Sequence, residues 1–473
     1  MDNKTGFARR IMNAGSWSVI GYGAGQILRF GSNLILTRLL YPEAFGIMAI
    51  VQAIMFGLIM LSDFGITHCI IRRERELDPE FINTAWTFQI IQGFIIGAIF
   101  CVLPPFIASI YSEPLLAQIM PLVGVNAIVS GFNSTNTAIL TRQVVIKKVV
   151  LFELFSAFIS TIIMIVLAWF EQSVWSLVWG GVLGSLFKMI TSHTMLEGIR
   201  HRIYWDKKSV KELVDFGKWI IIRSCLTFVD GEGNKLIMGG FLGVKILSFF
   251  NLANTINMMT WQLVQAVSGR VLISVYAEVL RERPERIQSV LTKCRLVFIS
   301  LVWSIALFFI FFGNKLMSFL YDQRYVESGK ILQMLALGSL LGILSGSYTH
   351  LLTAMGKIRA STILLVIKIL IQLMTILSGY YLFGELGVVL GVAVAEWFYY
   401  PFNTYYYAKI GFWQPRIDIP FLTLSIIVVY FTFANTDIFT LVKAEGSHDI
   451  NIWQFFTYCH ELILEKYEYI FKK

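Results

Sequence analysis

Charged side chains within long apolar segments are the residues of this sequence with the clearest chemical potential. The basic ones are Arg29, Lys188, Arg223, Lys235, Arg270 and Lys368, and the acidic ones are Asp63, Glu153, Asp230, Glu232 and Glu396. A charge in hydrocarbon costs about 3 kcal/mol or more, so such residues usually face the interior of a helix bundle or a water-filled cavity. In a cavity, a cation binds an anionic group, and a carboxylate binds a cation or takes up a proton.

Polar side chains recur around these charges at helical spacing. The stripes contain Tyr22, Gln26, Arg29 and Asn33; Asn126, Ser130 and Asn133; Arg223, Thr227, Asp230 and Asn234; Asn251, Thr255 and Gln262; Lys368, Gln372 and Thr375; and Glu396, Tyr400 and Asn403. Several polar stripes can meet only around a hydrated space, so the pattern predicts a cavity. The candidates for lining it are the cations Arg29, Arg223, Arg270 and Lys368 and the polar residues Gln26, Asn33, Asn133 and Gln262.

Each candidate also has a structural interpretation. Side chains near the ends of a membrane segment can reach the lipid headgroups instead of a cavity, and this applies to Lys188, Lys235, Arg270 and Arg223. Arg223 and Asp230 could simply neutralise neighbours on other helices. Asp63 and Glu153 are candidates for helix caps or gate contacts. Glu396, within the apolar run GVVLGVAVAEWFYY, is the best candidate for titration or cation binding, and Asp230 is the second; a hydrogen-bonded structural carboxylate is the alternative for Glu396.

The elements that must position these residues are membrane-spanning helices. The chain has 473 residues, of which 56% are hydrophobic and 15% are charged, and its mean hydropathy is +0.68. Soluble domains carry about a quarter charged residues, so a soluble enzyme and a large receptor ectodomain are excluded. Crossings of about 20 residues predict a six-helix lobe over residues 1–196, a basic connector over 197–218, a second six-helix lobe over 219–410 and a C-terminal extension over 411–473. In this extension we expect a short span over 421–433 and an uncertain topology over 450–473.

The distribution of Lys and Arg predicts the orientation. The N-terminal side and the even-numbered loops hold 24 of them, with Arg295 counted in a loop, whereas the odd loops hold five. Because basic loops remain on the cytoplasmic side, we expect a multi-pass protein of the bacterial plasma membrane with a cytoplasmic N-terminus. The net charge of +9 then follows from topology and does not indicate nucleic acid binding.

Motifs of membrane enzymes and metal sites are not found in the sequence. It contains no GxxxxGK[ST] phosphate-binding loop and no HExxH motif. The five cysteines are far apart and lack metal-ligand spacing. The longest loop between the predicted core spans on the outer side, about 313–330, is too short for a catalytic domain. We therefore expect neither an enzyme nor a metal cofactor.

The two predicted lobes resemble each other in sequence. A shift of 202 residues aligns Trp17 with Trp219 and Gly31 with Gly233 without a gap, together with several apolar positions. Six spans in each lobe give both the same orientation, which predicts a pseudo-two-fold axis along the membrane normal. Chance matching of apolar residues is the alternative.

Three stretches carry a resemblance to a known family: WSVIGYGAGQILRFGSNLILTRLLYPEAFGIMAI (17–50), LSDFGITHCIIRR (61–73) and FLYDQRYVESGKILQMLALGSLLGILSGSYTHLLTAMGKIRAS (319–361). With them the chain resembles the O-antigen and colanic-acid type oligosaccharide flippases. These form part of the polysaccharide transporter branch of the multidrug/oligosaccharidyl-lipid/polysaccharide exporter superfamily. The resemblance implies a V-shaped transporter of two lobes that alternates between inward-open and outward-open forms.

The resemblance also implies the substrate, a polyprenyl-diphosphate-linked oligosaccharide moved between leaflets for surface polysaccharide export. Its anionic diphosphate would bind the cavity cations, and its sugars would bind the polar stripes. The other partners implied are membrane lipids and the polysaccharide polymerase machinery. No cofactor is expected, and Asp230 or Glu396 would couple transport to a proton or sodium gradient.

Three alternatives stay open at this point. A multidrug or cation antiporter of the same superfamily would favour a compact acidic pocket, whereas the acids here are scattered. A flippase for the peptidoglycan precursor would share the architecture. An integral membrane enzyme of polysaccharide assembly is disfavoured by the short loops.

Overall fold

The structure is a computed structural model in which residues 2–62, 66–72 and 78–435 are described. Those residues form helices and short connections, and no strand occurs among them. Within this part of the chain, ten helices are long and apolar enough to cross a membrane. The expected all-helical membrane fold is therefore confirmed. The chain divides into two compact units, Met1–Ser248 and Phe249–Lys473, and each is described by itself.

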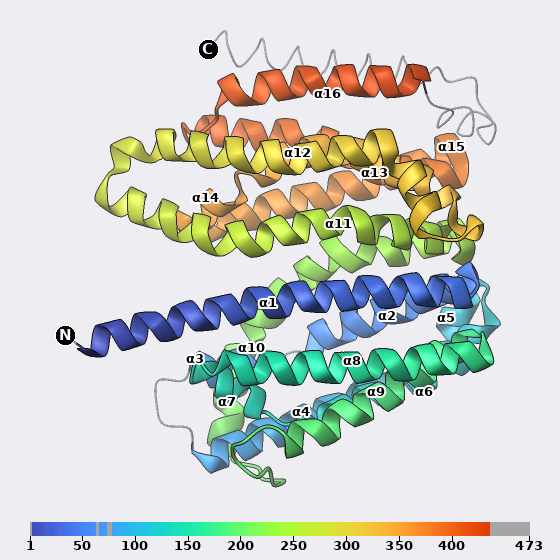
Figure 1. The fold of residues 1–473 in the computed structure, drawn as a ribbon, viewed down its shortest axis with the longest axis vertical. Coiled ribbons are helices and arrows are strands. Elements are labelled where there is room, and N and C mark those ends of the chain that lie inside the picture. The colour runs from blue at the N-terminus through green and yellow to red at the C-terminus, as the bar shows by residue number, and fades with distance from the viewer. Residues whose placement is uncertain (1, 63–65, 73–77, 436–473) are drawn as a thin grey trace. The chain divides into compact units, whose positions relative to one another are not determined.

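Unit 1 consists of long helices separated by short ones (Figure 1). The long helices are α1 (Asp2–Leu39), α2 (Pro42–Ser62), α4 (Pro79–Val102), α6 (Pro114–Gly131), α8 (Ile146–Glu171), α9 (Val174–Thr194) and α10 (Lys207–Phe228). The short ones are α3 (Ile66–Arg72), α5 (Pro104–Tyr111), α7 (Asn136–Arg142) and the π-helical turn η1 (Val229–Gly233), which leads into α11 (Asn234–Glu282). α8 packs against α9 and α1, and α4 packs against α6.

Proline fixes where several of these helices begin. Pro42, Pro79, Pro104 and Pro114 are the first residues of α2, α4, α5 and α6, and Pro415 is the first residue of α16 (Pro415–Asn435). The first helical position needs no backbone N–H donor, and the fixed φ of proline already suits a helix. Half of the ten prolines thus mark helix starts that are readable from the sequence.

Small residues allow α4 and α6 to approach closely. A Cβ atom on Gly93 would lie 2.8 Å from the carbonyl oxygen of Ala127, and one on Gly97 would lie 3.2 Å from that of Gly124. Interfaces between membrane helices are often built in this way, because lipid provides no hydrophobic force that drives helices together. A larger side chain at either glycine would separate the two helices.

The segment predicted as a basic connector is attached to unit 1. Before α10 begins, its backbone N–H groups at Arg202, Tyr204 and Asp206 donate to the side chains of Asn83, Thr87 and Thr84 on α4, over 3.0 to 3.1 Å. The donors are alternate residues, and their acceptors lie within little more than one turn of α4. The extended segment is therefore fixed along one helix.

Unit 2 is organised around α13 (Glu327–Gly346). Its other helices are the end of α11, α12 (Ile287–Leu320), α14 (Thr349–Ala354), α15 (Ile358–Lys409) and α16. In the segment that includes α13, 83% of an 18-residue apolar window is buried. In the segment that includes α15, the corresponding share is 17%. α13 packs against α12, α15 and α16, so it forms the core of this unit.

α15 is a hairpin of two helices. Gly384 has φ 63° and ψ −145°, which interrupts the helix between two arms. The arms are in direct backbone contact, because a Cβ atom on Gly387 would lie 1.9 Å from the carbonyl oxygen of Gly379. Gly243, with φ 65°, divides α11 in the same way. Both positions match boundaries between predicted spans.

The structure corrects the span predicted within the C-terminal extension. We expected a short span over 421–433, but the apolar helix begins at Pro415 and continues through Thr432. Arg416 and Asp418 precede the predicted span in the sequence, and the structure places both in α16, with Asp418 fully buried. Residues 436–473, including the stretch 450–473, lie outside the described part of the chain.

Candidate functional site

The polar stripe predicted on the first span lies along α1 in unit 1. Gln26 Nε2 donates to the hydroxyl of Tyr22 over 2.8 Å. Asn33 is half-buried, and its Oδ1 atom accepts no hydrogen bond from the described residues. Arg29 is exposed and forms no ion pair with any residue that the structure describes. This stripe therefore combines an exposed cation with a buried amide oxygen that has no partner among the described residues.

The other candidates of unit 1 are dispersed. Asn133, just after α6, has a buried Oδ1 atom without a partner among the described residues, and its carbonyl oxygen accepts from Gln89 over 3.1 Å. Glu153 is exposed on α8. Asp63 lies outside the described residues. Arg223 in α10 and Asp230 in η1 have a described backbone, but their side chains lie outside the described part.

Three of the candidates of unit 2 lie on α11 and on the first arm of α15. Gln262 is exposed on α11, whereas the side chain of Arg270 lies outside the described part. Lys368 lies on the first arm of α15 and is half-buried. It forms an ion pair with an acid on the second arm, and in unit 1 Lys235 forms one with Glu232 over 2.9 Å.

Lys368 and Glu396 form an ion pair between the two arms of α15. The Nζ atom of Lys368 lies 3.1 Å from Oε1 of Glu396, and the two side chains keep 28% and 24% of their exposure. These residues lie on separate predicted stripes. We expected Lys368 to be a cavity cation and Glu396 to be a coupling acid. The hairpin at Gly384 brings them together, because it turns the second arm back along the first.

The helix α13 borders this pair. A Cβ atom on Gly342 would lie 3.2 Å from the carboxyl carbon of Glu396, so the glycine provides the space that the carboxylate occupies. Three residues earlier on α13, Ser339 contacts Asn257 of α11 over 3.1 Å. One turn along the first arm from Lys368, Gln372 is buried. The Lys368–Glu396 pair thus lies in a polar patch within otherwise apolar helices.

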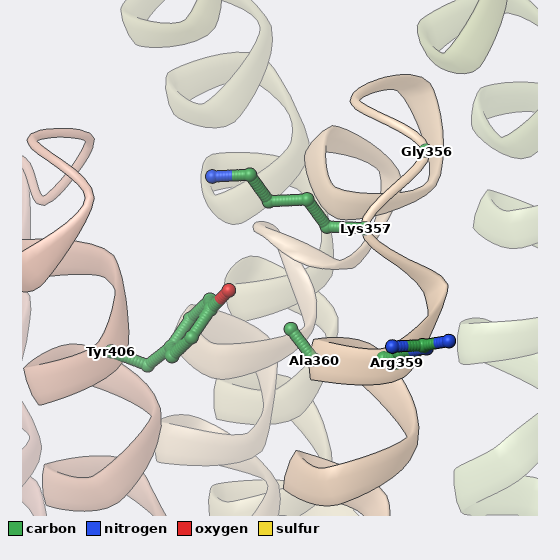
Figure 2. A pocket seen from close by; sticks show the side chains of 5 residues that line it. All are labelled: Gly356, Lys357, Arg359, Ala360 and Tyr406. Carbon is green, nitrogen blue, oxygen red and sulfur yellow. The ribbon is translucent and has the colours of Figure 1, made fainter.

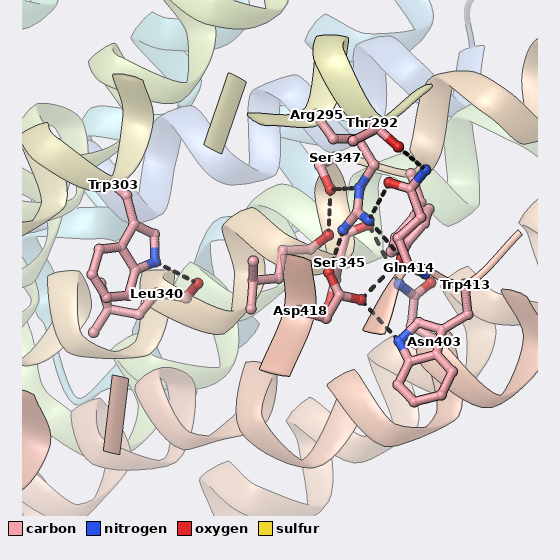
Figure 3. Close-up of polar contacts among 12 residues, drawn as sticks. Thr292, Arg295, Trp303, Leu340, Ser345, Ser347, Asn403, Trp413, Gln414 and Asp418 are labelled. Atoms are coloured by element: carbon pink, nitrogen blue, oxygen red, sulfur yellow. Dashed lines mark hydrogen bonds and ion pairs between the residues drawn. The ribbon is translucent and has the colours of Figure 1, made fainter. Parts of the chain in front are cut away.

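A second ion pair of unit 2, Arg295 with Asp418, was not predicted (Figure 3). The distance between Nη2 of Arg295 and Oδ1 of Asp418 is 2.6 Å, and both side chains are 0% exposed. Arg295 also donates to Ser347 over 2.9 Å, to the hydroxyl of Tyr348 over 2.7 Å and to Gln414 over 3.1 Å. The Tyr348 hydroxyl in turn donates to Asp418 over 2.9 Å.

This network connects α16 to α12 and to the turn between α13 and α14. Arg295 was counted as a loop cation, and the structure corrects this assignment: it is buried within α12. Trp413 Nε1 adds a third contact to Asp418 over 3.0 Å. Because both charges are satisfied inside the unit, the network is an anchor and not a binding site. The sequence contains a signal for this pair. Arg295 and Asp418 have opposite charges, and each stands before an apolar run on the same predicted side of the membrane.

Unit 1 contains a histidine cluster beside the connector. His201 Nε2 accepts from the backbone N–H of Thr135 over 3.1 Å and lies 2.7 Å from its hydroxyl. The ring centroid of His201 lies 5.5 Å from that of His193 and 5.3 Å from that of Trp86. Burial and the neighbouring His193 lower the pKa of His201 to about 4. His201 is therefore neutral near pH 7.

An open basic pocket lies at the end of the α15 hairpin (Figure 2). It has a volume of about 440 Å³ and is lined by Gly356, Lys357, Arg359, Ala360 and Tyr406. Figure 2 shows the ammonium of Lys357 and the hydroxyl of Tyr406 on the same side of the pocket, with Arg359 extending the other way. Within the described ranges, no group of three or more His, Cys, Asp or Glu side chains could hold a metal ion.

Comparison with known proteins gives a family match over most of the chain. Residues 35–330 match the family described as "Polysaccharide biosynthesis protein". Among curated proteins, the "Lipopolysaccharide biosynthesis protein WzxC" of Escherichia coli (strain K12) is 21% identical over 384 residues. That similarity covers 80% of this chain and 75% of the relative.

Two solved structures share the fold. The lipid II flippase MurJ in an inward closed conformation matches with a TM-score of 0.69 at 13% identity, over 96% of this chain and 98% of MurJ. An inward-facing multidrug resistance MATE family transporter of the MOP superfamily matches with a TM-score of 0.65 at 14% identity, over 82% of this chain and 95% of the transporter. The fold is therefore that of a membrane transporter.

Proposed function

Because this chain belongs to the family described as polysaccharide biosynthesis protein, we propose that it is a flippase for a lipid-linked oligosaccharide repeat unit. The observation that carries the proposal is that a chain of this family has, over 96% of its length, the fold of a flippase for a lipid-linked precursor. The family match and the shared fold both agree with a transporter and not with an enzyme.

The charges of the described residues suit a diphosphate-linked substrate. Arg29 is an exposed cation on α1, and Lys368 is a partly exposed cation on α15. Charge-assisted hydrogen bonds from such groups to phosphate oxygens are short and strong. The amide group of Gln26, on the same stripe as Arg29 and half-buried, is suited to bind a sugar hydroxyl.

The remaining parts of the proposal concern topology, coupling and partners. We place the N-terminus on the cytoplasmic side of a bacterial plasma membrane, because most Lys and Arg residues of the predicted loops share its side and basic loops remain cytoplasmic. Transport proceeds by alternating access and is coupled to a proton or sodium gradient through Glu396 or Asp230. The exported repeat unit is then passed to the polysaccharide polymerase machinery.

A multidrug or cation antiporter is the second candidate, because the MATE transporter shares the fold. Glu396, the best acidic candidate for a cation site, is already paired with Lys368 over 3.1 Å, which favours an anionic substrate. A peptidoglycan-precursor flippase is less favoured, since the family match is to polysaccharide biosynthesis.

A leaflet-exchange assay in proteoliposomes tests the proposal. The protein is offered a labelled polyprenyl-diphosphate oligosaccharide and, in parallel, a cationic dye. We expect exchange of the glycan and none of the dye, and we expect Arg29→Ala to slow glycan exchange by about tenfold or more, since one lost charged contact exceeds 1.4 kcal/mol. Lys409→Ala, which removes an exposed cation at the end of α15, is the matched control. Dye movement without glycan exchange would support the antiporter instead.

A further inference from the structure

We propose that the basic pocket at the open end of the α15 hairpin binds the phosphate group of an anionic phospholipid, such as phosphatidylglycerol. The pocket has a volume of about 440 Å³ and is lined by Gly356, Lys357, Arg359, Ala360 and Tyr406, all of unit 2. The ligand is a lipid of the surrounding membrane, so the inference is independent of the substrate that the protein carries.

Two cations and a hydroxyl give the pocket the chemistry of a phosphate site. Lys357 is half-buried, Arg359 is exposed, and neither forms an ion pair with a residue that the structure describes. Figure 2 shows the ammonium of Lys357 and the hydroxyl of Tyr406 on the same side of the pocket. A phosphate held there accepts hydrogen bonds from both groups, and the bond from the ammonium is charge-assisted and therefore strong. Arg359, which extends the other way, adds a second positive charge at the rim.

Acidic side chains are missing from the lining and from the neighbouring sequence. The described residues that line the pocket include no acid. The sequence has no Asp or Glu between Glu327 and Glu385 or between Glu396 and Asp418, and Asp418 is bound to Arg295 in the core. The pocket thus has a net positive charge. This favours an anionic headgroup over a zwitterionic one, whose own cation would find no partner in the pocket.

The start of α15 adds to the positive charge. Lys357 is the N-cap residue and makes no side-chain capping hydrogen bond, and the first turn of the helix contains no acid. The first N–H groups of a helix have no partner within it and carry the positive end of its dipole. Two cations at this position are unfavourable unless an anion lies beside the turn. A bound phosphate provides that anion.

The position of the pocket suits the depth of phospholipid headgroups. The apolar segment of α15 extends from Arg359 to Lys409 and turns at Gly384, so its two ends reach the same face of the membrane. Arg359 begins the segment, and Tyr406 lies one turn before its end. The pocket is therefore where both arms leave the hydrocarbon. Basic pockets between membrane helices are typical sites for anionic headgroups.

Exposed apolar side chains continue from the pocket along both arms. Ile363, one turn beyond Ala360, is 60% exposed, and Phe402, one turn before Tyr406, is 44% exposed. Because the arms are antiparallel, both residues lie on the hydrocarbon side of the pocket. A phospholipid can place its phosphate in the pocket and its acyl chains beside Ile363 and Phe402. A free phosphate gains nothing from these two residues, so we assign the site to a lipid.

Native mass spectrometry of the full-length protein, freed of lipid in detergent, tests the site with three probes. We expect wild type to bind phosphatidylglycerol about tenfold more tightly than phosphatidylcholine with the same acyl chains, because the choline cation opposes the basic residues. Glycerol 3-phosphate at about a hundredfold molar excess should leave most of the phosphatidylglycerol bound, because it has no acyl chains to bury. Equal affinity for the two lipids overturns the inference, and so does displacement by glycerol 3-phosphate, which would indicate a site for free phosphate.

Matched variants locate the binding. Lys357→Gln with Arg359→Gln should weaken binding of phosphatidylglycerol by roughly 25-fold, since each cation near an anionic headgroup contributes about fivefold in affinity. Lys293→Gln with Lys315→Gln removes the same charge from exposed positions of α12 outside the pocket, and it should bind as wild type does. Equal affinity of these two double variants for phosphatidylglycerol overturns the inference.

A charge-preserving variant separates charge from packing. Lys357→Arg with Arg359→Lys keeps both cations at the pocket, so it should retain the preference for phosphatidylglycerol over phosphatidylcholine. Loss of the preference in this variant would assign the effect to packing and would also overturn the inference.

Discussion

Replacing Asp418 by asparagine should strongly destabilise unit 2. The substitution keeps the shape of the side chain but leaves the guanidinium of Arg295 buried at 0% exposure without its counter-ion. Breaking a buried pair by removing one partner costs about 3–5 kcal/mol. We place the expected loss towards the lower end of that range, because Ser347, Tyr348 and Gln414 still accept hydrogen bonds from Arg295.

The assay is unfolding of the purified protein in mixed micelles, followed by tryptophan fluorescence. Trp413 is a local probe, since its Nε1 atom donates to Asp418 over 3.0 Å. Glu197→Gln is the control, because it removes one partner of an ion pair with Lys148 whose side chains are 83% and 48% exposed. Exposed pairs contribute about 0–1 kcal/mol.

A double variant separates the charge from the packing. Arg295→Met with Asp418→Leu removes both charges and should recover most of the lost stability, since apolar replacement of a buried pair is often neutral or stabilising. If the free energy of unfolding of Asp418→Asn differs from that of wild type by no more than that of Glu197→Gln does, the network does not anchor α16. That result would refute the reasoning.

Further predictions concern the hairpin, the histidine cluster and the connector. Gly387→Val should lower the thermal stability of the protein and disrupt the α15 hairpin, because its Cβ atom would overlap the carbonyl oxygen of Gly379 at 1.9 Å; unchanged melting would contradict the close contact. The pKa of His201 is lowered to about 4, so the unfolded chain binds more protons than the folded one between pH 6.5 and 4, and the free energy of unfolding should fall as the pH is lowered through that range. His201→Gln should remove this part of the pH dependence in unfolding titrations. Asn83→Ala removes the acceptor for the N–H of Arg202, so trypsin should cleave the connector faster than in wild type, and an unchanged rate would show that the attachment is unimportant.

The general architecture was predictable from the sequence because membrane helices depend on local composition. Span boundaries at Gly243 and Gly384 coincide with breaks that the structure shows inside α11 and α15. Helix starts at proline follow from the fixed φ and the missing N–H of that residue. These signals are local, and no contact between distant residues is needed to read them.

The pairing of charges was not predictable in the same way. Lys368 and Glu396 were both selected as polar residues in apolar spans, but periodicity along one helix does not give the rotation of another helix around its axis. Arg295 was counted in a loop, because it stands at the end of an apolar run and hydropathy cannot distinguish a solvated charge from a neutralised one. Asp418 precedes the span predicted over 421–433, although it lies inside α16.

The buried pair of Arg295 and Asp418 has a consequence for how the protein is made. Its members are 123 residues apart in the chain, and ribosomes add about 5–20 residues per second. For roughly 6–25 s of synthesis, α12 has entered the membrane while the carboxylate that neutralises its arginine does not yet exist. During that interval Arg295 must stay near the headgroups or be held by the insertion machinery. A chain that ends before Asp418 therefore never gains this counter-ion.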